Sequence, residues 1–543
     1  MAQATTTPHL PPSSGRARIG AIAVLLLALA WIYGYGIAAY PLKWEEPRRA
    51  LVAFEMVERQ DYIVPHLLGE PYRNKPPLHN WLIALAAGFD SDRIVPFTVR
   101  LPSLLAVLGT ALLLFALGSG PRHARHPLPA LLFLTTATVI QFGRAGETDM
   151  LFTFFLMAAF AAFELGRRRG SPSLQWVGSQ AAVGLAVLAK GIAPLYFYPP
   201  ILFLAWRRRA DFPCSARAFV LGAVVLLLII AAWIVPFALE SSLPALTRQA
   251  GAEIAERTPL HQPEPGANKQ PPYPVMLLLA GAPWSLVLLA LVLPRARRAA
   301  AGLRAEPYLV LAIAVVVWGI LAFAVVPRAR PRYLLPVLPF AAVIAACVLG
   351  ALGARSAAST GGSRRSVLAG GSAWSALAGV FFLFVLVAGR TVLAATPPAA
   401  RLALTIATAA VGSLVMIAAA WTSRRANPLA VWILALGLLY GVVFTGFWER
   451  RDADKRTRAL RAAEVLAAAV PDETIPLVCR NDFDRQVAYA LAHRLGRPLT
   501  VAVPAGEYVF VARDGDQPPL AAERVALGHG VAAYRVAAPE AER

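Results

Sequence analysis

Long apolar stretches dominate the chain from residue 19 to about residue 447, and short polar segments separate them. Most of them approach the roughly 20 residues that an α-helix needs to cross the core of a bilayer. We therefore predict about thirteen transmembrane helices. The first, over residues 19–40, is longer than most signal-peptide cores and is expected to be an uncleaved anchor. The others are expected near 101–118, 127–142, 149–166, 175–189, 192–206, 218–238, 274–293, 308–326, 333–353, 366–388, 402–421 and 428–447.

One apolar piece, residues 78–89, is too short to cross the bilayer core, and we expect it to lie in the interface. The arginine clusters between the later spans then all face the cytoplasm, as the positive-inside rule requires. If this piece crossed the membrane, every later cluster would face outward. We therefore predict a cytoplasmic N-terminus, an outward-facing C-terminus, and two outer-face loops, 41–100 and 239–272.

From residue 448 the composition changes to that of a soluble protein with balanced charge. Helical and strand-like patterns alternate there, which predicts a small α/β domain over 448–543 on the outer face, beyond a transmembrane domain over 1–447. We find no catalytic motif in it and expect a packing or acceptor-docking module. Its expected elements are helices near 453–469 and 483–495 and strands at 475–479, 498–503 and 507–512.

The composition excludes a soluble globular protein. Of 543 residues, 57% are hydrophobic and only 15% are charged, whereas an average soluble domain has roughly 25% charged residues. The net charge of +21 comes from clusters between apolar runs rather than from one basic stripe, so we expect no nucleic-acid binding. Cys214, Cys347 and Cys479 stand singly and indicate no metal or redox site.

The loop that follows the first span carries balanced charge beside the membrane. Glu45 and Glu46 precede an amphipathic helical stretch, and Arg48 and Lys75 add cations. Such acids can also cap a helix, and a charged loop is most often solvated surface. A carboxylate that accepts a proton and cations that hold a phosphate suit the transfer of a group from a lipid phosphate to an acceptor.

Further polar residues are expected at the same face. Asp149 begins a span, where it could also cap the helix, and Lys190 ends one, where lysines also snorkel. Arg332 and Tyr333 belong to a basic cluster where few cations are expected, and an anionic ligand or a lipid headgroup would explain it. The loop 239–272 lacks apolar periodicity and predicts a mobile lid. It carries Glu253, Arg257 and His261.

The run WEEPRRALVAFEMVERQDYIVPHLLGEPYRNKPPLHNWL resembles the first outer loop of membrane-embedded C-type (GT-C) glycosyltransferases that use polyprenyl-phosphate sugars. The nearest families are the lipid A aminoarabinose transferases and the protein O-mannosyltransferase superfamily. Members read Asp-Glu-x-Arg-Tyr-Ala, then Glu-Met, Gly-Asp-Trp, Pro and Gly-x-x-Tyr-x-x-Lys-Pro-Pro. The similarity continues at 149–150, 189–191, 253, 257, 281–284 and 332–336.

The resemblance implies an α-helical polytopic membrane protein with about thirteen spans. It also implies an inverting glycosyltransferase that moves a sugar from a polyprenyl monophosphate to a lipid (lipid A-like), glycan or protein acceptor. The reaction would occur at the outer leaflet of a bacterial inner membrane, among membrane lipids. No cofactor is implied, and we expect no metal site, because Asn74 stands where aminoarabinose-type relatives have a glutamate.

The same resemblance assigns site residues. The essential carboxylate falls on Glu45, although the register could favour Glu46, and the second carboxylate falls on Asp149. The donor-phosphate contacts fall on Arg48, Tyr72, Lys75 and Tyr333, with Arg332 as an addition, and the secondary candidates are Lys190, Glu253, Arg257 and His261.

Two alternatives remain. A transporter or flippase would predict two related halves with broken helices and ionisable residues near the middle of the spans. We find no such symmetry, and the charges lie at the ends of the spans. A non-catalytic protein that only binds a lipid-linked sugar stays open.

Overall fold

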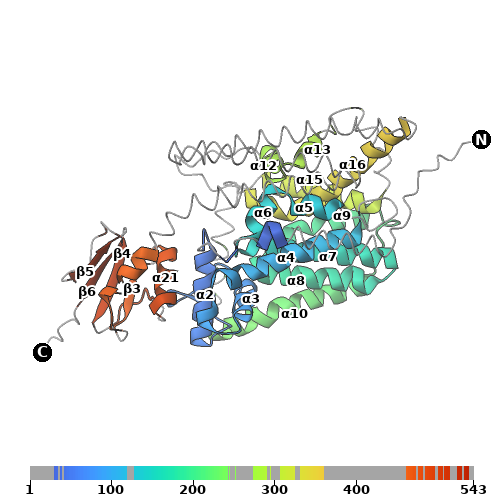
Figure 1. The fold of residues 1–543 in the computed structure, drawn as a ribbon. Helices are drawn as coiled ribbons and strands as arrows, with labels where there is room; N and C mark the ends of the chain where they lie inside the picture. Colours follow the sequence, from blue (N-terminus) through green and yellow to red (C-terminus); the bar gives the residue numbers. More distant parts are fainter. Residues whose placement is uncertain are drawn as a thin grey trace, which may run out of the picture.

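The structure is a computed structural model. It describes residues 42–118, 128–241, 273–289, 306–324, 331–359 and, with short gaps, 460–536, together with 30–34 and a few isolated positions. The helices form an elongated bundle, and a small sheet with one helix lies against one end of it (Figure 1).

Four described segments are long and apolar enough to cross a membrane: α4 (Pro96–Leu117), α7 (Thr148–Arg169), α10 (Ala216–Glu240) and Arg332–Leu349. The last comprises the 3-10 helix η7 (Pro331–Val337) and the start of α16 (Leu338–Ser359). Together they make this a multi-pass membrane protein. The predicted spans 366–388, 402–421 and 428–447 lie outside the described residues, and so does most of 19–40, so the number thirteen stays a prediction.

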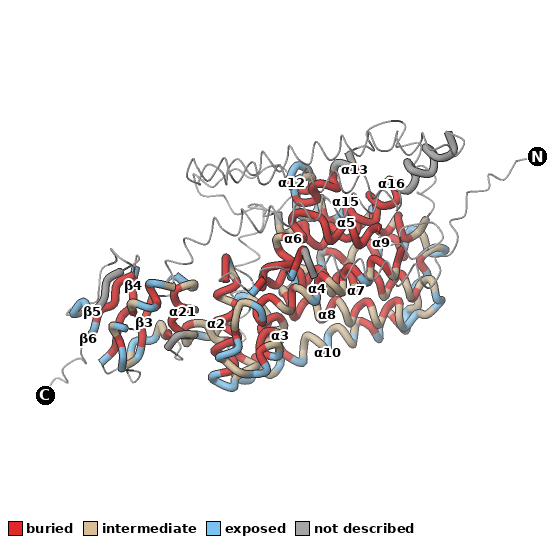
Figure 2. Tube along the Cα trace, viewed as in Figure 1, coloured by how far each residue is buried: buried red, intermediate tan, exposed pale blue. Residues whose placement is uncertain are grey.

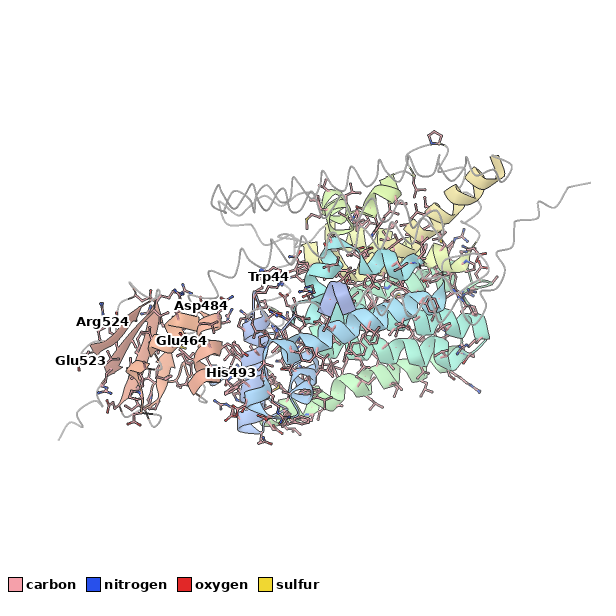
Figure 3. All side chains as sticks on the ribbon, viewed as in Figure 1. Trp44, Glu464, Asp484, His493, Glu523 and Arg524 are labelled. Carbon is pink, nitrogen blue, oxygen red and sulfur yellow. The ribbon has the colours of Figure 1, made fainter. Side chains whose placement is uncertain are left out.

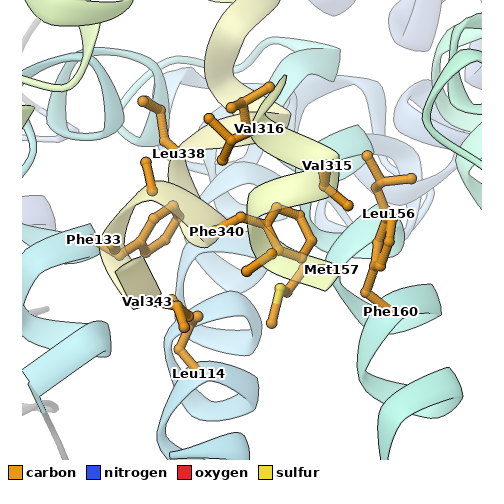
Figure 4. Close-up of a cluster of buried hydrophobic side chains, with 14 of the residues drawn as sticks. Leu114, Phe133, Leu156, Met157, Phe160, Val315, Val316, Leu338, Phe340 and Val343 are labelled. Atoms are coloured by element: carbon orange, nitrogen blue, oxygen red, sulfur yellow. The ribbon is translucent and has the colours of Figure 1, made fainter. Parts of the chain in front are cut away.

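The core of the bundle lies between α4, α7 and α16. Phe160 of α7 packs edge-on against Phe340 of α16 with ring centroids 4.7 Å apart, and Leu114 and Phe133 lie in the same buried cluster (Figure 4). By contrast, α10 carries exposed leucines along much of its length (Figure 2). Such an apolar outer face is what lipid contact requires.

The other helices of the bundle are shorter. They are α5 (Leu128–Leu134), α6 (Ala137–Gly143), the π-helix η3 (Ser173–Gly178), α8 (Ser179–Lys190), the 3-10 helix η4 (Ala193–Phe197), α9 (Pro199–Arg207), α12 (Tyr273–Ala280), α13 (Ser285–Leu289) and α15 (Pro307–Ala324).

Three of the predicted spans are not continuous helices. The span 127–142 divides into α5 and α6, 192–206 into η4 and α9, and 274–293 into α12 and α13. Two of the interruptions satisfy each other's polar groups: the Ala137 N–H donates to the Ala282 carbonyl (2.9 Å), and Trp284 Nε1 donates to Thr135 Oγ1 (2.9 Å). Irregular backbone is tolerated at membrane depth where it is paired inside the protein in this way.

The 41–100 segment covers the end of the bundle that carries the sheet. It contains α2 (Glu46–Arg59), the short hairpin β1 (His66–Leu67) and β2 (Glu70–Pro71), α3 (Leu78–Ala86) and the 3-10 turn η2 (Ser91–Arg93). The nine-residue α3 agrees with the prediction that residues 78–89 are too short to span. The Glu55 carboxylate accepts from the Leu68 and Gly69 N–H groups (2.5 and 3.0 Å), which holds the hairpin against α2.

The described C-terminal residues form a four-stranded sheet in the order β3-β4-β6-β5 with helix α21 (Arg485–Leu495). Residues 460–466 are also helical, within the predicted helix 453–469, of which 453–459 lie outside the described residues. The strands are β3 (Leu477–Cys479), β4 (Tyr508–Arg513), β5 (Ala522–Gly528) and β6 (Val531–Val536). The elements α21, β3 and β4 were predicted, whereas β5 and β6 were not. The predicted strand 498–503 is reduced to one parallel bridge, between Thr500 and Val478 of β3. The next N–H, of Val501, donates to Leu68 in the 41–100 segment (3.0 Å).

Helix α21 packs against α2, so the C-terminal part shares a core with the 41–100 segment. Leu51 and Phe54 of α2 and Val487 and Leu491 of α21 are buried in one cluster. The Tyr489 hydroxyl also donates to the Ile94 carbonyl (2.6 Å). Apolar burial and a few polar contacts therefore hold the two parts together.

Replacing Tyr489 with Phe should loosen this docking by about 1 kcal/mol, because the Ile94 carbonyl loses its donor. Hydrogen exchange of residues 460–536 should become faster. Tyr534→Phe, which removes a hydroxyl from the sheet, is the control. Equal exchange in Tyr489→Phe and the wild type would contradict the assigned contact.

Candidate active site

The side chain of Glu46 joins three segments of the chain. It is fully buried and accepts from Arg100 Nε (2.8 Å) and Nη2 (2.9 Å), from the Lys43 N–H (2.7 Å) and from the Gly146 N–H (2.7 Å). Burial alone would raise the pKa of Glu46, but Arg100, Lys43 and the Gly146 N–H outweigh it and hold the pKa below its usual value. Both oxygens of the Glu46 carboxylate therefore already accept hydrogen bonds from protein groups.

Glu45 is the adjacent carboxylate and is placed differently. It stands at the N-cap position of α2 without a side-chain cap hydrogen bond, so capping does not account for it. Its side chain is 30% exposed and pairs with Arg48 (Glu45 Oε2 to Arg48 Nη1, 2.6 Å). Of the two glutamates, Glu45 is the one that a substrate can reach.

A second carboxylate begins α7. Asp149 is buried, and its Oδ1 lies 2.5 Å from Lys190 Nζ at the end of α8. The same ammonium lies over the rings of Phe152 (5.1 Å) and Tyr333 (5.5 Å). The structure thus brings together Asp149, Lys190 and Tyr333, which the sequence analysis selected from three separate segments.

Glu147, which the sequence analysis did not select, lies two residues before Asp149. Its Oε2 accepts from Arg332 Nη1 (2.8 Å), so the guanidinium predicted to bind a phosphate also holds this carboxylate. Burial and the nearby Asp149 raise the pKa of Glu147 to about 7. The pair Glu-x-Asp at the start of a span was the only signal that could have found it.

A second residue that was missed is Arg49. The family motif has a tyrosine at this position, and here Arg49 Nη2 donates to the Tyr72 hydroxyl (2.8 Å) while the guanidinium lies 5.4 Å from the Tyr72 ring centre. Arg49 is only 4% exposed. The predicted phosphate ligand Tyr72 is therefore positioned by a cation.

The groups of α2 and of α7 form one site. Glu147 interacts electrostatically with Glu45 and Glu46 of one group and with Asp149 and Arg332 of the other. Lys75 also interacts electrostatically with Asp149. His79, also not selected from the sequence, is buried between the two groups, and burial and the Arg49 charge lower its pKa to about 3, so it is neutral.

Three of the predicted site residues cannot be placed in the site. Glu253, Arg257 and His261 lie outside the described residues, as does most of the predicted lid. Among the residues that are described, no group of three or more His, Cys, Asp or Glu side chains could hold a metal ion. Whether the site takes a metal therefore stays a prediction from Asn74, which stands where aminoarabinose-type relatives have a glutamate.

Residues 74–235 match the family described as dolichyl-phosphate-mannose-protein mannosyltransferase. The chain is 32% identical over 198 residues to the undecaprenyl phosphate-alpha-4-amino-4-deoxy-L-arabinose arabinosyl transferase of Edwardsiella ictaluri, covering 34% of this chain and 35% of that protein. A Pseudomonas fluorescens protein described in the same way is 30% identical over 204 residues, covering 35% and 33%. These alignments span about a third of the length of the curated relatives.

The crystal structure of ArnT from Cupriavidus metallidurans bound to undecaprenyl phosphate superposes with a TM-score of 0.73 at 17% identity, covering 96% of this chain and 98% of that one. Its apo form gives 0.72 at 18% identity. The chain has the GT-C fold. The predicted resemblance to the GT-C glycosyltransferases is confirmed by this fold and by the partial alignments.

Replacing Glu46 with Gln should destabilise the protein by about 3–5 kcal/mol at neutral pH, because the buried Arg100 loses its counter-charge. The pKa of Glu46 is lowered in the folded state, so its contribution is present above about pH 4.5 and is lost as the pH falls through the folded value. Thermal unfolding of the two proteins should therefore converge in acid. The control Glu70→Gln changes an exposed residue and should unfold at the same temperature as the wild type at every pH. A difference in unfolding temperature between Glu46→Gln and the wild type that did not change with pH would refute the ion-pair explanation.

Proposed function

We propose that this protein is an inverting glycosyltransferase that moves a sugar from a polyprenyl monophosphate to an acceptor. The observation that carries the proposal is the meeting of Glu45 and Asp149 with Arg48, Lys190 and Arg332 at one end of the bundle. The shared fold supports it, because ArnT of that fold was solved with undecaprenyl phosphate. The partial alignments to the arabinosyl transferases support the same reaction class.

In the proposed reaction an acceptor oxygen attacks C1 of the sugar from the face opposite the phosphate. The new C1–O bond forms as the bond from C1 to the phosphate oxygen breaks, and the polyprenyl monophosphate leaves with the bonding electron pair. When the acceptor is a hydroxyl, its proton passes to a carboxylate. A phosphate acceptor carries no such proton at neutral pH, and the carboxylates would then orient it.

We assign proton acceptance to Glu45 rather than to Glu46. Glu45 is partly exposed and has one ion-pair partner. By contrast, both carboxylate oxygens of Glu46 already accept hydrogen bonds from protein groups. Glu46 is proposed as a positioning residue. Asp149, paired with Lys190, is proposed to orient the acceptor or the sugar.

The leaving phosphate needs cations that are already in place. Arg48, Tyr72, Lys75 and Tyr333 are proposed to hold it, and Lys190 lies over the Tyr333 ring. Fixed donors stabilise the charge that develops on a leaving group without reorganising at the moment of reaction. Arg332 is proposed as a further cation, positioned by Glu147.

The finer topology belongs to the same proposal. We propose thirteen spans, a site at the outer leaflet of a bacterial inner membrane, and a periplasmic C-terminal domain over residues 448–543. The acceptor is proposed to be a lipid A-like lipid, a glycan or a protein, with the loop 239–272 as a lid. The arginine clusters between spans support this orientation.

Replacing Glu45 with Gln should lower transfer at least about a hundredfold, because the proton acceptor is lost. Envelope glycolipids, glycans and glycoproteins of cells that lack the protein would be compared by mass spectrometry after complementation with the wild type, Glu45→Gln or Glu58→Gln. Glu58 is exposed on the same helix and serves as the matched control. The wild type and Glu58→Gln should restore the modified species, and Glu45→Gln should not.

The same strains separate the alternatives. A protein that only binds or flips a lipid-linked sugar needs no proton acceptor, so Glu45→Gln would then restore the glycan profile fully. If the protein is an enzyme, purified Glu45→Gln should still bind undecaprenyl phosphate but should no longer transfer the sugar. If cells without the protein showed the same glycolipids, glycans and glycoproteins as the wild type, the proposed glycosyltransferase activity would be refuted.

A further inference from the structure

The C-terminal part brings a cation to the site. Arg485 is the first residue of α21, which packs against α2. It interacts electrostatically with Glu45, Arg48, Arg49 and Tyr72, all of which belong to the 41–100 segment. Figure 3 shows Asp484, the residue before Arg485, on the side of the C-terminal part that lies towards Trp44, and Arg524 on the opposite side.

The nearest acid to Arg485 in sequence serves another purpose. The Asp484 carboxylate accepts from the Gln486 N–H (2.8 Å), and its carbonyl accepts from the Ala488 N–H (2.9 Å), so it caps the first turn of α21. The other nearby carboxylate, Glu45, already pairs with Arg48. Among the described residues, the start of α21 therefore adds positive charge to the site and no further acid.

Positive charge is in excess at this point. Among the described residues, Arg485 interacts with two other guanidinium groups, those of Arg48 and Arg49, and with one carboxylate, that of Glu45. Burial and the charge of Arg48 lower the pKa of Arg485. Each of the three also has a buried nitrogen without a hydrogen-bond partner: Nε of Arg48, Nη1 of Arg49 and Nε of Arg485. Buried donors that stay unpaired are costly, and a ligand with several anionic oxygens would pair them.

We propose that Arg49 and Arg485, together with Arg48 and Tyr72, bind a phosphate group of a substrate, so that the C-terminal part forms one wall of the reaction site. This deepens the proposed function and rests on it. A tetrahedral phosphate matches the planar, forked donors of arginine, which bind two oxygens at once. The phosphate would belong either to the polyprenyl donor or to a phosphorylated acceptor.

The test measures binding alone, using the purified full-length protein in detergent. The first pair of probes is undecaprenyl phosphate and undecaprenol, which differ only in the phosphate. Arg485→Gln should weaken binding of undecaprenyl phosphate roughly tenfold to a hundredfold and leave undecaprenol unchanged. Arg485→Lys should retain part of the affinity, because the charge remains but the forked contact is lost.

The second pair of probes distinguishes the source of the phosphate. Diphosphoryl and monophosphoryl lipid A differ by one phosphate group. If the acceptor supplies the phosphate, Arg485→Gln should weaken only the diphosphoryl form and leave undecaprenyl phosphate unchanged. Arg49→Gln should weaken binding of the same phosphate probe that Arg485→Gln weakens.

Arg524→Gln is the matched control, since it removes the same charge from an exposed position on β5 of the same part. Thermal unfolding monitors the fold of each variant, and Arg485→Lys keeps the test valid if Arg485→Gln unfolds. Unchanged binding of both phosphate probes overturns the proposal, and so does equal weakening of probes with and without the phosphate. Because no transfer is measured, a protein that binds phosphate but transfers no sugar would refute the proposed function and leave this site intact.

Discussion

The arrangement of the site depends on one buried carboxylate. Glu46 fixes the start of α2 to α4 through Arg100 and to the turn before α7 through the Gly146 N–H. Because Glu45 directly precedes Glu46 in the chain, this anchor also determines where the Glu45 carboxylate lies. A buried ion pair adds little net stability, since both charges lose water, but it strongly disfavours any arrangement that separates them. Of the two consecutive acids, Glu46 is thus fixed inside the protein, whereas Glu45 stays partly exposed.

The start of α7 repeats this principle with partners from other segments. Glu147 pairs with Arg332 before α16, and Asp149 pairs with Lys190 at the end of α8. Three segments therefore meet through carboxylate–cation pairs. Charges held in this way are already oriented before a substrate binds, which is the condition for stabilising a departing phosphate at low cost. The site is thus built from ion pairs between segments more than from any single element.

Hydropathy predicted most of the described spans because lipid requires long apolar helices, and the short length of residues 78–89 predicted that α3 does not span. Hydropathy could not predict the break between α5 and α6, because the Ala137 N–H at that break is satisfied by the Ala282 carbonyl, which is far away in sequence. Glu45 and Arg48 were selected because a long local motif carries them, and Asp149 because it begins a predicted span. Glu147 and Arg49 were missed since their roles come from partners distant in sequence. Edge strand β5, which is rich in charged and small residues, carries little of the apolar alternation that reveals a strand.

The docking of α21 on α2 changes how the C-terminal part can be understood. Gly69 lies so close to Thr500 that a Cβ atom there would approach the Thr500 hydroxyl to 2.8 Å, so the two parts meet through backbone as well as through side chains. A phosphate shared by Arg49 and Arg485 would bind both parts at once. Its binding free energy would then add to their docking, because a ligand stabilises the arrangement to which it binds. A compositional boundary near residue 448 therefore need not be a boundary of the reaction site.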